Sequence, residues 1–227
     1  MRNQNRRTTH AVGGVGGTRV VLPVAACVLL SATACNLLLP AAFVGDHRTK
    51  VLAEFDKLPN SRVAVLVWAP ASTRFDYPQI SFELGAHITE LLGTNLTSKE
   101  TTIDLVDPRD VADFLQKEPS AANNPMKVGE EFKTDYVVFV EIHRFQVRDP
   151  DAPELLRPAI DGGVSVYDVR ARSDERPRYE LAPVEVEYND GKPVLLTATN
   201  SYAVRDMIYR MFAEQVARKF YEHSIEM

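Results

Sequence analysis

Two segments of the chain are apolar at consecutive positions rather than at every second position. They are residues 62–70 (RVAVLVWAP) and 136–142 (YVVFVEI). In an extended strand, side chains point alternately to opposite faces, so these segments present apolar groups on both faces. Strands of this kind have to be covered on both sides. The pattern therefore predicts a central sheet with helices packed on each face.

Apolar residues recur at spacings of three and four over residues 78–98, which predicts an amphipathic helix after the first strand. A second strand is expected at 102–106. Asp107 and Pro108 then favour a helix start, because aspartate caps free backbone N–H groups and proline suits the first helical position. Two more helices are expected: a short one over 126–133, and a long one from residue 200 or 201 to about 222.

Residues 163–172 and 178–188 alternate more regularly between apolar and polar positions, with turn residues between them. This pattern predicts antiparallel strands, with a further edge strand over 194–199. The predicted fold is an α/β (α+β) sandwich. It has a mixed central sheet of about five strands, helices on both faces and a long C-terminal helix. Its size is that of one domain.

An apolar run of 25 residues, from Val20 to Val44, precedes this domain. A bilayer-spanning helix needs about 20 residues, so a plain membrane anchor is one interpretation. The other is a signal peptide cut at Cys35, since small residues (SATA, 31–34) precede this cysteine and the first 34 residues carry arginines but no acid. On the second interpretation, residues 1–34 are the signal peptide, 35–58 a membrane-proximal tether and 59–227 the domain.

The composition narrows the functional classes. Four of the 26 basic residues and none of the 31 acidic residues precede Cys35, which leaves 22 against 31, a formal charge of about −9, for the remainder. An acidic domain lacks the basic surface that displaces counterions from phosphates, so nucleic acid is not an expected partner. Both cysteines, Cys27 and Cys35, lie in the signal region. No disulfide, no CxxC metal or redox site and no cofactor is therefore expected, whereas a zinc site built from histidines and carboxylates stays open.

Catalytic signatures such as a nucleophile elbow, HExxH or a Walker loop do not occur in the sequence. His87 and Glu90 are one helical turn apart, but a solvated helix face explains them better than metal binding does. The most catalytic-looking group is Glu141 and His143, with Arg144 and Asp149 nearby. A polar sheet rim or an internal hydrogen bond explains that group better than an acid/base pair does.

The order of these motifs resembles a group of bacterial envelope lipoproteins. They include the periplasmic domain of the curli secretion channel lipoprotein, the lipoprotein activators of penicillin-binding proteins and the amino-terminal domain of TolB. The resemblance rests on RVAVLVWAP, VDPRDVADFL, VGEEFKTDYVVFVEI and VSVYDV, and spans roughly residues 62–220. It implies a sandwich like the anticodon-binding domain and no catalysis. The sequence departs from the group at 133–136, where KTDY replaces the Gly-Ala-Asp-Tyr frequent in relatives.

Two functions follow. One is a non-catalytic lipoprotein that faces the periplasm, is held by its N-terminal lipid and binds another envelope protein or a second copy of itself. Asn36 after the cysteine favours the outer membrane, since aspartate there retains lipoproteins in the inner membrane of some bacteria. The alternative is a periplasmic hydrolase of envelope polymers that uses paired carboxylates such as Asp149, Asp151 and Glu154.

One further expectation concerns residues 148–163 (RDPDAPELLRPAIDGG), which contain three prolines and are longer than most loops. Leu155, Leu156 and Ile160 have little reason to occur in a solvated loop. They are candidates for contact with a partner, unless they pack against the protein's own surface.

Cys35→Ala is expected to abolish labelling by a fatty-acid probe and to leave an uncut precursor, because the acceptor thiol is lost. Cys27→Ala is the matched control and is expected to label normally. Labelling that survives in Cys35→Ala and disappears in Cys27→Ala would move the lipid to Cys27. Labelling unchanged in both variants would indicate a plain membrane helix.

Overall fold

The computed structural model describes residues 48–171, 178–195, 197 and 200–226. Cys27, Cys35 and the expected signal peptide lie outside these residues. Residues Lys50–Ile225 form one compact unit, which contains the central sheet and its helices. Within the described part of the chain, no helix is both long enough and apolar enough to cross a membrane.

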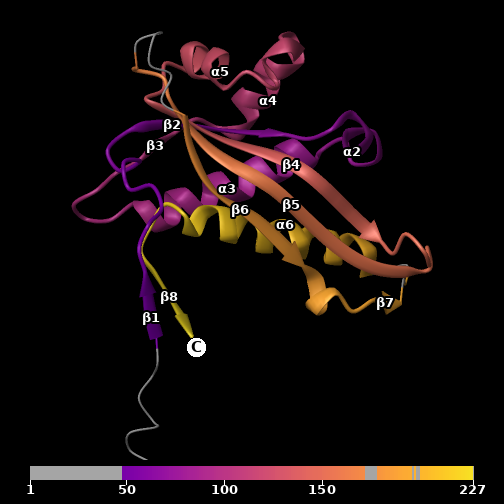
Figure 1. The fold of residues 1–227 in the computed structure, drawn as a ribbon. Helices are drawn as coiled ribbons and strands as arrows, with labels where there is room; N and C mark the ends of the chain where they lie inside the picture. Colours follow the sequence, from indigo (N-terminus) through magenta and orange to yellow (C-terminus); the bar gives the residue numbers. More distant parts are fainter. Residues whose placement is uncertain (1–47, 172–177, 196, 198–199, 227) are drawn as a thin grey trace, which may run out of the picture. The chain divides into compact units, whose positions relative to one another are not determined.

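A six-stranded mixed sheet forms the centre of the unit (Figure 1), with the strand order β3-β2-β4-β5-β6 and β7 paired to β5. Strands β3, β2 and β4 are parallel, whereas β4, β5 and β6 are antiparallel neighbours. The strands are β2 (Arg62–Trp68), β3 (Asp104–Leu105), β4 (Tyr136–Arg148), β5 (Leu155–Asp168), β6 (Arg178–Glu187) and β7 (Val194–Leu195). A separate two-stranded sheet pairs β1 (Arg48–Val51) with β8 (His223–Glu226).

Helices cover both faces of the sheet (Figure 1), which confirms the predicted sandwich. Helices α3 and α6 pack on one face, and α4 and α5 pack on the other. Along β2 the side chains alternate as expected, with Val63 and Val65 in the first layer and Ala64 and Leu66 in the second. The helices are α2 (Ala71–Asp76), α3 (Ile80–Leu96), α4 (Pro108–Lys117), α5 (Pro125–Phe132) and α6 (Asn200–Arg218), with short 3-10 turns η1 (Pro119–Ala121) and η2 (Tyr188–Gly191).

The start of α4 follows from its sequence. The Asp107 carboxylate accepts a hydrogen bond from the backbone N–H of Arg109 at 2.8 Å, and Pro108 occupies the first helical position. Helix α5 ends at Lys133, which adopts the left-handed conformation with φ of 51°. Glycine adopts this conformation without strain, and lysine stands here where the resembled group often has glycine.

The structure corrects the loop expected over residues 148–163. Strand β5 already begins at Leu155, so only residues 149–154 connect β4 to β5. The proline and glycines that suggested a loop lie at two irregularities of the sheet. Pro158 lies where the β4–β5 register shifts, and Gly162 lies at a second shift, where an added Cβ would come within 2.5 Å of the Glu141 carbonyl oxygen.

The expected contact surface at Leu155, Leu156 and Ile160 is therefore wrong. Leu156 and Ile160 are fully buried, and they pack against the protein's own residues in two core clusters. Leu155 is half-buried and pairs with Leu195 of β7. These apolar side chains belong to strand β5, so burial in the fold accounts for them.

The packed unit begins before residue 59, where the sequence placed the domain start. Phe55 and Leu58 are buried in the main core. Glu54 binds the end of α6: its carboxylate lies 2.8 Å from the Lys219 Nζ and also accepts the backbone N–H of Ala182 at 2.9 Å. Burial by itself would raise the pKa of Glu54. The hydrogen bonds from Lys219 and Ala182 lower it by more than burial raises it, so the pKa lies below its usual value.

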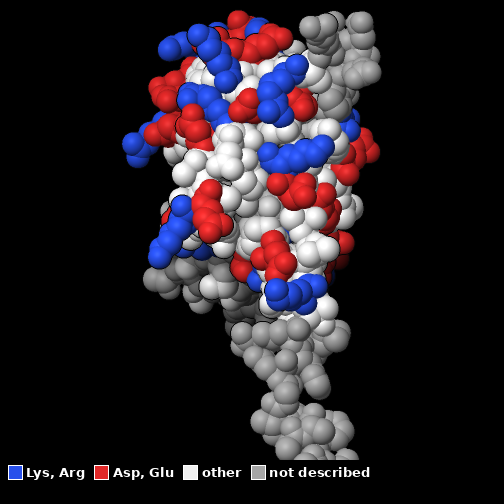
Figure 2. Space-filling view, turned by 90° about the vertical axis from the view of Figure 1, so that its left-hand side faces the viewer, with Lys and Arg blue, Asp and Glu red and all other residues white. Residues whose placement is uncertain are grey.

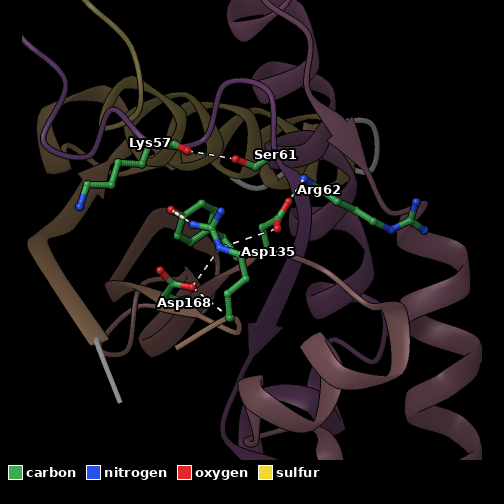
Figure 3. A network of polar contacts seen from close by, with 7 residues as sticks. Lys57, Ser61, Arg62, Asp135 and Asp168 are labelled. Atoms are coloured by element: carbon green, nitrogen blue, oxygen red, sulfur yellow. Dashed lines mark hydrogen bonds and ion pairs between the residues drawn. The ribbon is translucent and has the colours of Figure 1, made fainter. Parts of the chain in front are cut away.

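A polar network closes the amino end of β2 and β4 (Figure 3). The Asp135 carboxylate accepts the backbone N–H of Arg62 at 2.8 Å. The Arg170 guanidinium lies over the Tyr136 ring, 4.5 Å from its centroid, and donates to the Asp168 carboxylate at 3.3 Å. The hydrogen bond to Asp168 raises the pKa of Arg170. These contacts link the neighbouring strands β2, β4 and β5 at one end of the sheet.

Leu156→Ala is expected to lower the free energy of unfolding by about 2–5 kcal/mol, because it opens a cavity in the core. Leu52→Ala is the control, since 74% of Leu52 is exposed, and it is expected to change the value by less than about 0.5 kcal/mol. Chemical denaturation of the full chain in detergent measures both. A loss below about 0.5 kcal/mol for Leu156→Ala would contradict its burial.

Candidate functional site

The connections at the carboxyl ends of β2 and β3 run to opposite faces of the sheet. The chain passes from β2 to α3 on one face, and from β3 to α4 on the other. In open α/β sheets, a crevice forms outside the carboxyl ends of neighbouring strands whose connections separate in this way, and ligands bind there. The structure has a pocket at this position.

The pocket has a volume of about 290 Å³ and lies between the end of β2 and helices α3 and α4. An engineered cavity of about 150 Å³ holds benzene, so this pocket is large enough for one bulky apolar side chain with room to spare. Trp68, Phe82 and Leu115 are half-buried and line it. The side-chain surface that the pocket offers to a ligand is therefore largely apolar.

Small residues on the two flanking helices keep the pocket open. Gly85 of α3 lines it, and a Cβ added there would meet only Val67, at an ordinary contact distance of 3.8 Å. Ala112 of α4 lines it from the other helix. Larger side chains at these two positions would take up space that the pocket now leaves empty.

Helix α2 stands beside the pocket and is mostly exposed. None of its residues is buried, and 86% of Phe75 is exposed. The neighbouring Arg74 lines the pocket. A phenylalanine that is almost fully exposed next to an apolar pocket extends the apolar surface available to a partner.

A second hollow of about 390 Å³ adjoins the first and shares Phe82 and Pro108 with it. Arg109, Asp107, Glu90 and Thr89 also line this hollow. The Asp107 carboxylate is engaged as the cap of α4. The Thr89 hydroxyl is buried and has no hydrogen-bond partner among the described residues.

The two arginines at these hollows differ from the other arginines of the domain. Among arginines whose side chains the structure describes, Arg74 and Arg109 make no side-chain hydrogen bond or ion pair. The others all have a partner: Arg62, Arg144, Arg148, Arg157, Arg170, Arg178, Arg205, Arg210 and Arg218. The N-terminus of α3, at Gln79, also lacks a side-chain cap and adds positive potential here.

Among the polar residues that looked catalytic from the sequence, Arg144 and His143 share the Asp161 carboxylate, whereas Asp149 pairs with Arg157. Arg144 binds Asp161 at 2.6 Å and Glu185 at 2.9 Å, and His143 lies 4.0 Å from the same Asp161 carboxylate. His87 lies 3.5 Å from the Asp206 carboxylate, between α3 and α6. Across residues 48–171, 178–195, 197 and 200–226, no three His, Cys, Asp or Glu side chains are placed to hold a metal ion.

The carboxylates proposed for a hydrolase do not line the pocket. Asp149 is buried; one of its carboxylate oxygens accepts a hydrogen bond from the backbone N–H of Asp151 at 2.9 Å, and the Arg157 guanidinium lies 3.0 Å from the other oxygen. Asp151 and Glu154 are exposed in the same loop. None of these three lines the pocket or the adjoining second hollow.

Charges of both signs are interspersed over the surface shown in Figure 2, and no continuous basic stripe runs over the described residues of that face. The pocket itself was not predicted from the sequence. The sequence contains only weak indications of this pocket. Trp68 and the Ala69-Pro70 pair lie at the end of a strand that is apolar on both faces, and residues 85 and 112 are small.

No family model matches the chain, and no curated protein matches it. Several solved structures are similar to it. The PelC dodecamer from Paraburkholderia phytofirmans is 9% identical, with a TM-score of 0.39, over 77% of this chain and 98% of that chain. Lipoprotein GNA1162 from Neisseria meningitidis is 13% identical, with a TM-score of 0.39, over 70% and 99%. The hypothetical protein CT253 from Chlamydia trachomatis is 14% identical, with a TM-score of 0.37, over 70% and 95%. With TM-scores below 0.5, these likenesses carry no conclusion about function.

Proposed function

We propose that this chain is a non-catalytic lipoprotein of a bacterial cell envelope whose α/β domain binds another protein. The basic first segment, the apolar run and the small residues before Cys35 support lipid attachment at that cysteine. Lipid attached there holds the domain on the periplasmic side, and Asn36 favours the outer membrane. The domain then presents the apolar pocket at the carboxyl end of β2 to its partner.

The pocket is the observation that carries this proposal. Protein interfaces depend on a few aromatic and arginine side chains clustered around a well-formed pocket. Here Trp68 and Phe82 line the pocket, Arg74 lies at its border and Phe75 extends from the neighbouring helix. The combination matches the composition of an interface centre, which is rich in aromatic residues and arginine.

The same lining argues against chemistry in the pocket. Arg74 is the one charged side chain among the described residues that line it. Arginine keeps its proton at neutral pH and does not act as a general base. The polar side chains that remain are Gln79, Ser81 and Gln116, none of which has a histidine, carboxylate or lysine in the lining to activate it.

A photo-crosslinking phenylalanine analogue at position 75 of the full chain, in intact cells, tests this proposal. It is expected to give a discrete protein adduct on irradiation, because position 75 borders the binding surface. Combining it with Ala112→Leu fills the pocket and is expected to remove the adduct.

The same analogue at Tyr202 is the matched control, since 67% of Tyr202 is exposed and it lies on α6 outside the pocket lining. It is expected to give no such adduct. A second control combines the analogue at 75 with Ala203→Leu, which adds the same bulk to an exposed position of α6. Adducts that are absent at 75, or that persist unchanged with Ala112→Leu, would contradict binding at this pocket.

A further inference from the structure

We propose that the partner inserts a bulky apolar side chain into the pocket and carries carboxylates on both sides of that side chain. This inference rests on the proposed function and specifies the chemistry of the segment that is bound. It follows from the size of the pocket, from the two arginines without partners and from their positions.

The apolar part of the bound segment follows from the pocket. A volume of about 290 Å³, lined by half-buried Trp68 and Phe82, leaves apolar surface in contact with solvent. Covering that surface with a leucine or phenylalanine side chain removes it from water, which is the main favourable contribution to protein association. Gly85 and Ala112 leave the necessary room.

The acidic part follows from the arginines. In a domain of net negative charge, the other arginines with described side chains are engaged in hydrogen bonds or ion pairs, whereas Arg74 and Arg109 are not. A planar guanidinium binds a carboxylate through two parallel hydrogen bonds, so arginines without partners suit an acidic ligand. Glu90 and Asp107 also line the second hollow, and Asp107 is engaged as the cap of α4, so Arg109 is the group there that a carboxylate of the partner would pair with.

The positions of the arginines favour a peptide segment over a small amphiphile. Arg74 extends from α2 at the first hollow, and Arg109 extends from α4 at the second. A fatty acid has one carboxylate and could satisfy only one of them. A segment of another protein can place an apolar side chain between two acidic ones and reach both arginines together.

Trp68 is the chain's one tryptophan, so its fluorescence reports on this pocket alone. The full chain in detergent is titrated with the tryptophan-free peptide acetyl-Glu-Glu-Leu-Phe-Glu-Glu-amide. The expected result is a saturable change in fluorescence that weakens as salt is raised. Two further peptides, with lysine in place of glutamate or with alanine in place of leucine and phenylalanine, are expected to bind at least tenfold more weakly.

Arg74→Gln and Arg109→Gln are each expected to weaken binding of the acidic peptide about tenfold. Their melting temperatures are expected to stay unchanged, because neither side chain has a partner to lose. Lys192→Gln is the matched control. It removes an exposed positive charge outside both hollows and is expected to bind normally.

Any of three binding results would overturn the inference: equal binding of the lysine peptide, binding unchanged in both arginine variants, or dodecanoate binding as tightly as the acidic peptide. A crosslinked dimer of the chain through position 75 would identify a second copy as the occupant and would also overturn it. If the acidic peptide does not bind but the adduct at position 75 forms and is removed by Ala112→Leu, the proposed function stands and only the proposed chemistry of the partner is wrong. If no adduct forms at 75, the proposed function itself fails.

Discussion

The need to cover both faces of strands β2 and β4 governs the rest of this structure. Their side chains alternate between two apolar layers, one under α3 and α6 and the other under α4 and α5. Parallel strands of this kind cannot leave either face in water, because each face would expose a row of valine and leucine side chains. Every other element of the unit is arranged around that requirement.

The pocket is a consequence of the same requirement. A helix must follow β2 on one face and another must follow β3 on the opposite face, so the covering layers separate where these strands end. Trp68, at that end, is only half-buried as a result. The two arginines without partners occur at the same place: Arg74 is the one charged residue among the described residues that line the pocket, and Arg109 shares the adjoining hollow with Glu90 and Asp107.

The sequence predicted those parts of the fold in which local pattern and tertiary packing agree. Strand β2 and the capped start of α4 are examples, because consecutive apolar residues and the Asp107-Pro108 pair each have one favourable structure. Only the last part of strand β5 was predicted, by the strand expected over 163–172; its first part was missed because Pro158 and the pair at 162–163 normally mark loops, whereas here they lie at shifts in register. The pocket was missed because its lining comes from segments far apart in the chain, and no local pattern shows that Gly85 and Ala112 line the same pocket.

The most direct test of an open, positively charged pocket is the quenching of Trp68 fluorescence by iodide and by caesium at low ionic strength. The overall negative charge of the domain would make caesium the better quencher at a typical surface site. The structure predicts the reverse, with iodide the more effective quencher, and it predicts that Arg74→Gln combined with Arg109→Gln removes this preference. Stronger quenching by caesium in the unaltered chain would contradict the account.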